Sequence, residues 1–145
     1  MSVVVAGCGG GSNAPSRQEF AKDAEKICRD TEKELESFGQ DVGTPEEAGE
    51  AIDKVIERAR KAADQLADLD RPDGDDGETA RKFAEGFRTE LEDKLIPALE
   101  ELKRAVQAKD PQALQEAVTK LQKLEATESD RYARELGIRA CAGAA

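Results

Sequence analysis

The chain contains no histidine and no tryptophan, and aromatic side chains make up only 3% of its 145 residues. Without histidine it lacks the commonest general base, the commonest metal ligand and every nucleophilic pair that depends on histidine. The Glu-x-x-His motifs of di-iron helical bundles are excluded for the same reason. A core with so few aromatics has to be built from aliphatic side chains, mainly alanine and leucine, and this composition favours closely packed helices.

Long apolar runs and a net positive charge are also missing. No stretch approaches the roughly 18 apolar residues needed to span a membrane. The 22 basic and 32 acidic residues give a formal charge of −10. Nucleic acids and anionic lipid headgroups are bound by basic patches, so we expect neither as a partner, and a charged partner should be cationic. Carboxylates are too numerous to single out an acid and base pair, so we expect no enzymatic activity and no cofactor.

Helix start signals are the clearest patterns from residue 16 onward. Ser16 with Glu19, and Thr44 with Glu47, are capping boxes, in which two side chains each satisfy a free backbone N–H at the helix start. Asp110-Pro111 combines an N-cap residue with a proline at the first helical position. Apolar residues recur at spacings of three and four after each start. These patterns predict helices over about 16–38, 45–69, 78–108 and 111–136.

Glycine and proline indicate where these helices end or bend. We expect Gly39 and Gly137 to end their helices in the left-handed conformation, with Ile138 folding back onto the last turn. Pro97 lies inside the third helix and lacks an N–H group, so we expect a kink there. Gly86 either lets a neighbouring helix approach closely or is only a tolerated glycine.

Four long amphipathic helices with short connections predict an all-α fold, an up-down-up-down four-helix bundle over residues 16–145. Residues 1–15 are then a separate N-terminal segment. Val5-Ala6-Gly7-Cys8, followed by a glycine-rich spacer, resembles the lipobox of bacterial lipoproteins, whose cysteine accepts a diacylglyceryl group. The resemblance implies that Cys8 is the lipid attachment site of a protein on the outer face of the cytoplasmic membrane, because two or more acyl chains give stable anchoring.

The signal in front of this motif is short. Only Met1 to Gly7 precede Cys8, with no basic residue among them, whereas a secretory signal has a basic region and an apolar stretch of about 7–15 residues. We therefore expect either a start codon further upstream or a truncated chain. The alternative is a glycine-rich N-terminus on a cytoplasmic helical interaction protein with three free thiols.

Cys28 and Cys141 are the two cysteines that remain once Cys8 carries a lipid. In an up-down-up-down bundle the start of the first helix and the end of the fourth lie at the same end, and Gly137 lets the chain turn back towards the first helix. We therefore predict a Cys28–Cys141 disulfide, which an extracytoplasmic compartment permits. The alternative is a small buried Cys28 and a free thiol at Cys141.

Three stretches together, Val5-Ala6-Gly7-Cys8, Ile27-Cys28-Arg29 and Leu136 to Cys141, resemble small helical lipoproteins of high-GC Gram-positive bacteria. The resemblance implies a cell-envelope location and carries no reaction or ligand with it. We expect a monomeric protein that binds another protein or a small ligand.

Two further clusters are weaker candidates for sites. The acidic turn between the second and third helices does not match an EF-hand, but its oxygens suit a weak Ca²⁺ site; a solvated turn is the simpler interpretation. This turn comprises Asp68, Asp70, Asp73, Asp75, Asp76 and Glu78. Phe83, Phe87 and Tyr132 either line a small apolar pocket opposite Pro97 or belong to the core. Exposed apolar area beside Pro97 would favour a bundle that binds an apolar ligand.

Overall fold

The computed structural model describes residues 13–142, and this part of the chain is entirely helical, without a strand. A π-helical turn, η1, joins α3 and α4 into one continuous helix from 74 to 108, so the described residues form five separate helices. The predicted all-α class is confirmed. The elements are α1 (Arg17–Phe38), α2 (Pro45–Asp68), α3 (Gly74–Glu90), η1 (Leu91–Leu95), α4 (Ile96–Ala108), α5 (Pro111–Gln122) and α6 (Glu128–Leu136).

The first two helices begin where the capping boxes predict. The Ser16 hydroxyl accepts a hydrogen bond from the backbone N–H of Glu19 at 3.2 Å, and the Glu19 carboxylate accepts one from the N–H of Ser16 at 2.8 Å. Thr44 and Glu47 make the same pair of bonds at the start of α2. These contacts are local in sequence, which is why the two starts can be predicted without tertiary information.

The start of the third helix corrects the prediction, because α3 begins at Gly74, inside the acidic turn that was expected before residue 78. Gly74 has a φ of 69°, a conformation that glycine adopts readily. A Cβ at Gly77 would overlap the carbonyl oxygen of Pro72. The chain can therefore enter the helix this early only because residue 77 has no side chain.

Pro97 follows the π-helical turn of the long helix. The N–H of Ile96 bonds to the carbonyl of Leu91, five residues back, in place of the four-residue spacing of an α-helix. Turns of this kind accommodate a break in the regular hydrogen-bond pattern. The helix thus continues past Pro97 to Ala108, and Lys109 ends it in the left-handed conformation with a φ of 54°.

The predicted fourth helix over 111–136 is wrong as a single element, because residues 123–127 separate α5 from α6. The cause is a contact from another helix. The Glu90 carboxylate of α3 accepts hydrogen bonds from the Glu128 N–H, at 3.0 Å, and from the Ser129 hydroxyl. Thr127, the N-cap residue of α6, makes no side-chain capping bond, so Glu90 supplies the acceptor that starts this helix.

The two predicted glycine caps have opposite outcomes. Gly39 has a φ of −93°, so the expected left-handed cap at the end of α1 is wrong. Gly137 has a φ of 82°, and the N–H of Ile138 bonds to the Ala133 carbonyl at 2.8 Å. Ile138 is fully buried, so the predicted return of the chain onto α6 is confirmed.

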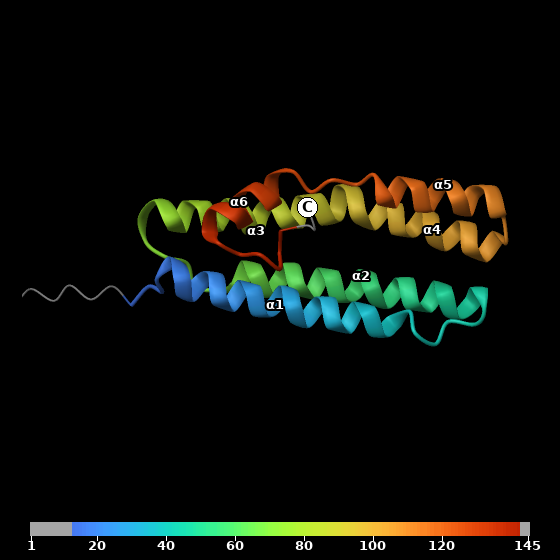
Figure 1. Ribbon diagram of the computed structural model, residues 1–145, viewed down its shortest axis with the longest axis horizontal. Helices are drawn as coiled ribbons and strands as arrows, with labels where there is room; N and C mark the ends of the chain where they lie inside the picture. Colours follow the sequence, from blue (N-terminus) through green and yellow to red (C-terminus); the bar gives the residue numbers. More distant parts are fainter. Residues whose placement is uncertain (1–12, 143–145) are drawn as a thin grey trace, which may run out of the picture.

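The helices form a bundle of two antiparallel pairs (Figure 1). The first pair is α1 with α2, and the second is the long helix with α5 and α6. One core cluster surrounds Phe20, Leu66 and Phe83, and a second surrounds Ile56 and Leu99. Within the described residues α1 and α5 form no packed interface, so the bundle is left open between these two helices.

Candidate functional site

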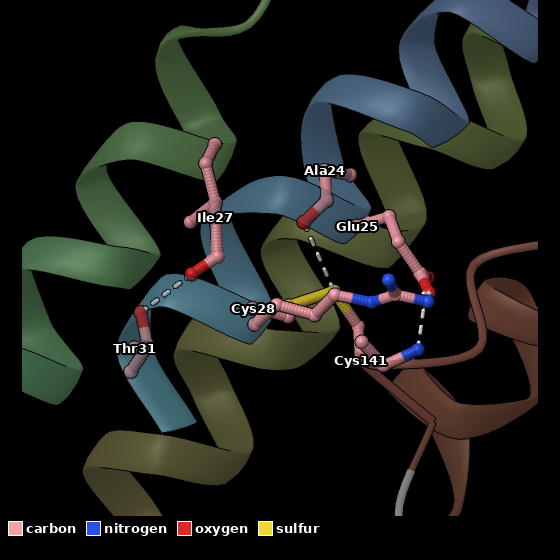
Figure 2. Close-up of a disulfide and its surroundings, with 8 residues drawn as sticks. Ala24, Glu25, Ile27, Cys28, Thr31 and Cys141 are labelled. Carbon is pink, nitrogen blue, oxygen red and sulfur yellow. Dashed lines mark hydrogen bonds and ion pairs between the residues drawn. A yellow bond between two sulfur atoms is a disulfide. The ribbon is translucent and has the colours of Figure 1, made fainter. Parts of the chain in front are cut away.

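A disulfide joins Cys28 of α1 to Cys141 in the C-terminal tail, residues 138–142, with the two Cα atoms 5.4 Å apart. Figure 2 shows the bond between α1 and the tail. The prediction of this pair is confirmed, and the chain turns at Gly137, as predicted, before the tail reaches α1. The other predicted site residue, Cys8, and most of the predicted 1–15 segment lie outside the described residues.

Glu25 holds the tail beside the disulfide. Its carboxylate accepts a hydrogen bond from the Ala140 N–H at 2.9 Å and pairs with Arg29 at 2.8 Å. Figure 2 shows Glu25 beside the disulfide. The bond from Ala140 is the main cause that lowers the pKa of Glu25 below its ordinary value, with a smaller contribution from Arg29. The folded state therefore stabilises the ionised form of Glu25. The two residues of this contact are 115 positions apart, so no local sequence pattern could predict it.

An apolar groove of about 360 Å³ lies between α1 on one side and α5 and the 123–127 connection on the other. Several leucines line it, and Cys141 of the disulfide is also part of its lining. The volume is at the lower end of the range of roughly 300–1,000 Å³ for small-molecule pockets. The groove is lined by residues that include Thr31, Leu35, Ala59, Phe87, Leu91, Leu95, Leu121, Leu124 and Cys141.

The three aromatic side chains considered as one pocket occupy different places. Phe83 is fully buried in the first core cluster. Phe87 lies 6.3 Å from Phe83 between ring centroids, packs against both core clusters and lines the groove. Tyr132 packs at the edge of the first cluster, with the Arg131 guanidinium 4.6 Å above its ring. Only Phe87 therefore contributes to the groove.

Charged side chains at the edge of the groove are mainly acidic. Glu90, Glu125 and Asp130 lie there together with one base, Lys94. The Glu90 carboxylate is occupied by the start of α6. Two more acids, Glu32 and Glu36, border the adjoining depression, which shares Thr31, Leu35, Phe87 and Cys141 with the groove. The rim therefore has an excess of negative charge.

The acidic residues between α2 and α3 do not converge. Asp75 and Asp76 lie in the first turn of α3, where negative charge interacts favourably with the helix dipole. Nowhere in residues 13–142 do three acidic or cysteine side chains form a group able to hold a metal ion. Asp75 and Asp76 are therefore residues of the start of α3.

Sequence reasoning missed the groove, although part of its signal is visible in α5. Leu114, Val118 and Leu121 recur at spacings of four and three and lie on one face of the helix. Leu114 and Val118 are 37% and 38% exposed, and Leu121 lines the groove. The sequence shows this apolar stripe but cannot show that no other helix covers it.

The fold and these features define a class: a small all-α bundle closed by one disulfide and open along an apolar groove. No protein-family model, curated protein or solved structure matches the chain. None of the helices in the described part of the chain is both long enough and apolar enough to cross a bilayer.

Proposed function

We propose that this chain is a lipid-anchored, extracytoplasmic binding protein without catalytic activity, located on the outer face of the cytoplasmic membrane. The Cys28–Cys141 disulfide carries the proposal. Disulfides persist in oxidising compartments and are rare in the cytosol, so the bond and the lipobox-like motif at Cys8 point to the same location. The bond is present in the structure, whereas the motif at Cys8 is a feature of the sequence, and both support the assignment.

The apolar groove supports a binding role. It combines aliphatic walls with a charged rim, the usual composition of a binding site. Among the described residues, the groove presents no histidine, free thiol or clustered metal ligand. These side chains suit binding through shape and apolar contact. Binding of an apolar ligand, an alternative predicted from the sequence, is therefore part of the same proposal.

The bundle architecture extends this proposal. We infer that α5 and α6 together take the place of the fourth helix of an up-down-up-down bundle, and that the long helix is kinked where η1 precedes Pro97. The break between α5 and α6 lets residues 123–127 turn along the groove. A monomer is expected, because the net charge of −10 opposes association of identical chains.

Palmitate labelling in a bacterial host tests the anchor. The gene, with its upstream in-frame codons restored, is compared with its Cys8→Ser variant, and Cys28→Ser is the matched control because it removes a different cysteine. We expect label on the parent and the control and none on Cys8→Ser. An unlabelled parent would refute the anchor and favour the cytoplasmic alternative.

Intact mass before and after reduction tests the disulfide on the same material. Reduction of one internal bond adds two hydrogens, about 2 Da. A mass that does not change on reduction would mean that the thiols are free, and would remove the main support for an extracytoplasmic location.

A further inference from the structure

We propose that the groove binds a basic amphipathic helix from a partner protein. The inference deepens the proposed binding function and rests on it. Three features of the described residues lead to it: the open position between α1 and α5, the length of the apolar surface that continues from the groove along α5, and the acidic character of the rim.

The open position has the surroundings of a helix-binding groove. Leu35 of α1 and Leu121 of α5 lie on opposite walls, while Leu91 and Leu95 belong to the long helix between them. In a bundle, an apolar surface bounded by two helices is covered by side chains of another helix spaced three and four residues apart. Apolar groups from successive turns of such a helix would enter the groove between these leucines.

The apolar surface is longer than the groove itself. Leu124 of the 123–127 connection and Leu121 of α5 line the groove, and the apolar surface continues along α5 through Val118 to Leu114. On α5 the stripe from Leu114 to Leu121 covers two helical turns, or about 10 Å at 1.5 Å per residue, and a partner helix of similar length would cover it. A single bound acyl chain in the groove would leave Leu114 and Val118 uncovered, whereas a helix lying along α5 covers them.

The acidic rim of the groove favours a basic partner. Glu125 is exposed and makes no hydrogen bond or ion pair in the described structure, and Glu32 and Glu36 border the adjoining depression. Lys94 is the single base among the described residues that line the groove. A helix with lysine or arginine beside its apolar stripe would place positive charge along this rim. A second copy of the chain, with a net charge of −10, would place like charges together.

Two synthetic peptides of 15 residues test the proposal directly. One combines leucine at helical spacing with lysine, and the other has the same leucines with glutamate at every lysine position. Each carries a fluorophore and is titrated with the oxidised full chain, with anisotropy as the readout. We expect saturable binding of the lysine peptide that weakens with salt, and at least about tenfold weaker binding of the glutamate peptide. Equal binding of the two peptides, or none of the lysine peptide, would overturn the proposal.

A matched pair of variants on α5 locates the binding surface. Val118→Lys places a charge on the apolar stripe, whereas Gln112→Lys makes the same change of net charge roughly 160° around the helix from Leu114. Both positions are exposed, so neither change disturbs the core, and circular dichroism verifies the fold. We expect Val118→Lys to weaken the lysine peptide at least about tenfold and Gln112→Lys to weaken it less than about threefold. Similar losses for both would mean that the peptide binds only through general charge, against the proposal.

Two further outcomes would assign the surface to another occupant. Dimerisation in sedimentation equilibrium that Val118→Lys abolishes would make a second copy the occupant, and laurate binding without peptide binding would make it an acyl chain; either overturns the helix proposal. The peptide titration needs no lipid at Cys8. Its failure is therefore distinguishable from a failure of the anchor, which palmitate labelling reports.

Discussion

The two ends of the bundle are built differently. In the closed half, comprising the first part of α1 together with α3, α6 and the tail, Phe20, Phe83 and Ile138 are at most 1% exposed. In the open half, comprising the end of α1 and the 39–44 connection together with α4 and α5, large apolar side chains reach the surface: Val42 is 40% exposed, Val118 38% and Leu114 37%. The disulfide and the Glu25 and Glu90 contacts all lie in or beside the closed half.

The closed half supplies most of the stability of the fold, and the open half supplies most of the exposed apolar surface. The disulfide, the Glu25 and Glu90 hydrogen bonds and full burial hold the closed half together without help from a partner. In contrast, α5 is held mainly by its packing on α4 and by the Lys120–Glu101 ion pair at 2.7 Å. Exposed ion pairs contribute little to stability. The groove lies where the two halves meet, because Phe87, Ser129 and Cys141 of the closed half also line it. The closed half keeps the protein folded while the apolar stripe on α5 stays exposed.

Removing the disulfide should have the largest effect on the closed half. Cys28 and Cys141 are separated by 113 positions. A cross-link over this separation lowers the entropy of the unfolded chain, which stabilises the fold by about 4–5 kcal/mol. We expect the double variant Cys28→Ala and Cys141→Ala to lose about this much unfolding free energy in urea titration. A loss below about 1 kcal/mol would mean that the tail does not fasten the closed half.

Truncation of one large side chain in each half compares the cores directly. We expect Phe83→Ala to cost about 3–5 kcal/mol, because the ring is fully buried in the first cluster. Leu114→Ala should change stability by less than about 0.5 kcal/mol, since Leu114 is 37% exposed. Urea unfolding of both variants checks this, and comparable costs would contradict the division into closed and open halves.

Two glycines of α3 show how tightly the closed half is assembled. At Gly77 a Cβ would overlap the Pro72 carbonyl oxygen, so Gly77→Ala should cost about 1–3 kcal/mol. At Gly86 a Cβ would lie 3.6 Å from the Ser129 backbone nitrogen, an ordinary contact. Gly86→Ala should therefore be neutral or stabilise by up to about 1 kcal/mol through helix propensity. Thermal unfolding of the pair tests this, and the reverse order would refute the described packing of Pro72 on α3.

The smallest effect is the pH dependence from Glu25. Its pKa in the folded state lies below its ordinary value of 4.5 because the Ala140 N–H and Arg29 stabilise the carboxylate. The contribution is complete above the unfolded pKa and is lost as the pH falls through the folded value. We expect Glu25→Gln to lose about 1 kcal/mol at pH 7 and to differ less from the parent below pH 4. Glu50→Gln, exposed on α2, is the control, and equal losses for both at every pH would refute this assignment.

Features set by neighbouring residues could be predicted from the sequence. The capping boxes at Ser16 and Thr44 and the Gly137 turn each depend on a few adjacent positions. The early start of α3 and the break before α6 depend on Pro72 lying against Gly77 and on Glu90 capping a helix 38 positions away. Such contacts exist only after the helices have packed, and no local pattern encodes them.

The candidate sites divide in the same way. The disulfide could be predicted because bundle topology and the turn at Gly137 together place Cys141 beside α1. The groove could not, since it depends on α1 and α5 remaining apart. Lipid attachment at Cys8 stays a prediction, because that residue lies outside the described part of the chain.

The disulfide also makes residues 28–141 a covalent ring. A protease that cuts the backbone once inside this ring opens it without releasing a fragment. The connections 39–44, 69–73 and 123–127 between helices all lie within it. After one such cut, the walls of the groove stay attached to each other and to the N-terminal segment, and a second cut is needed to separate them.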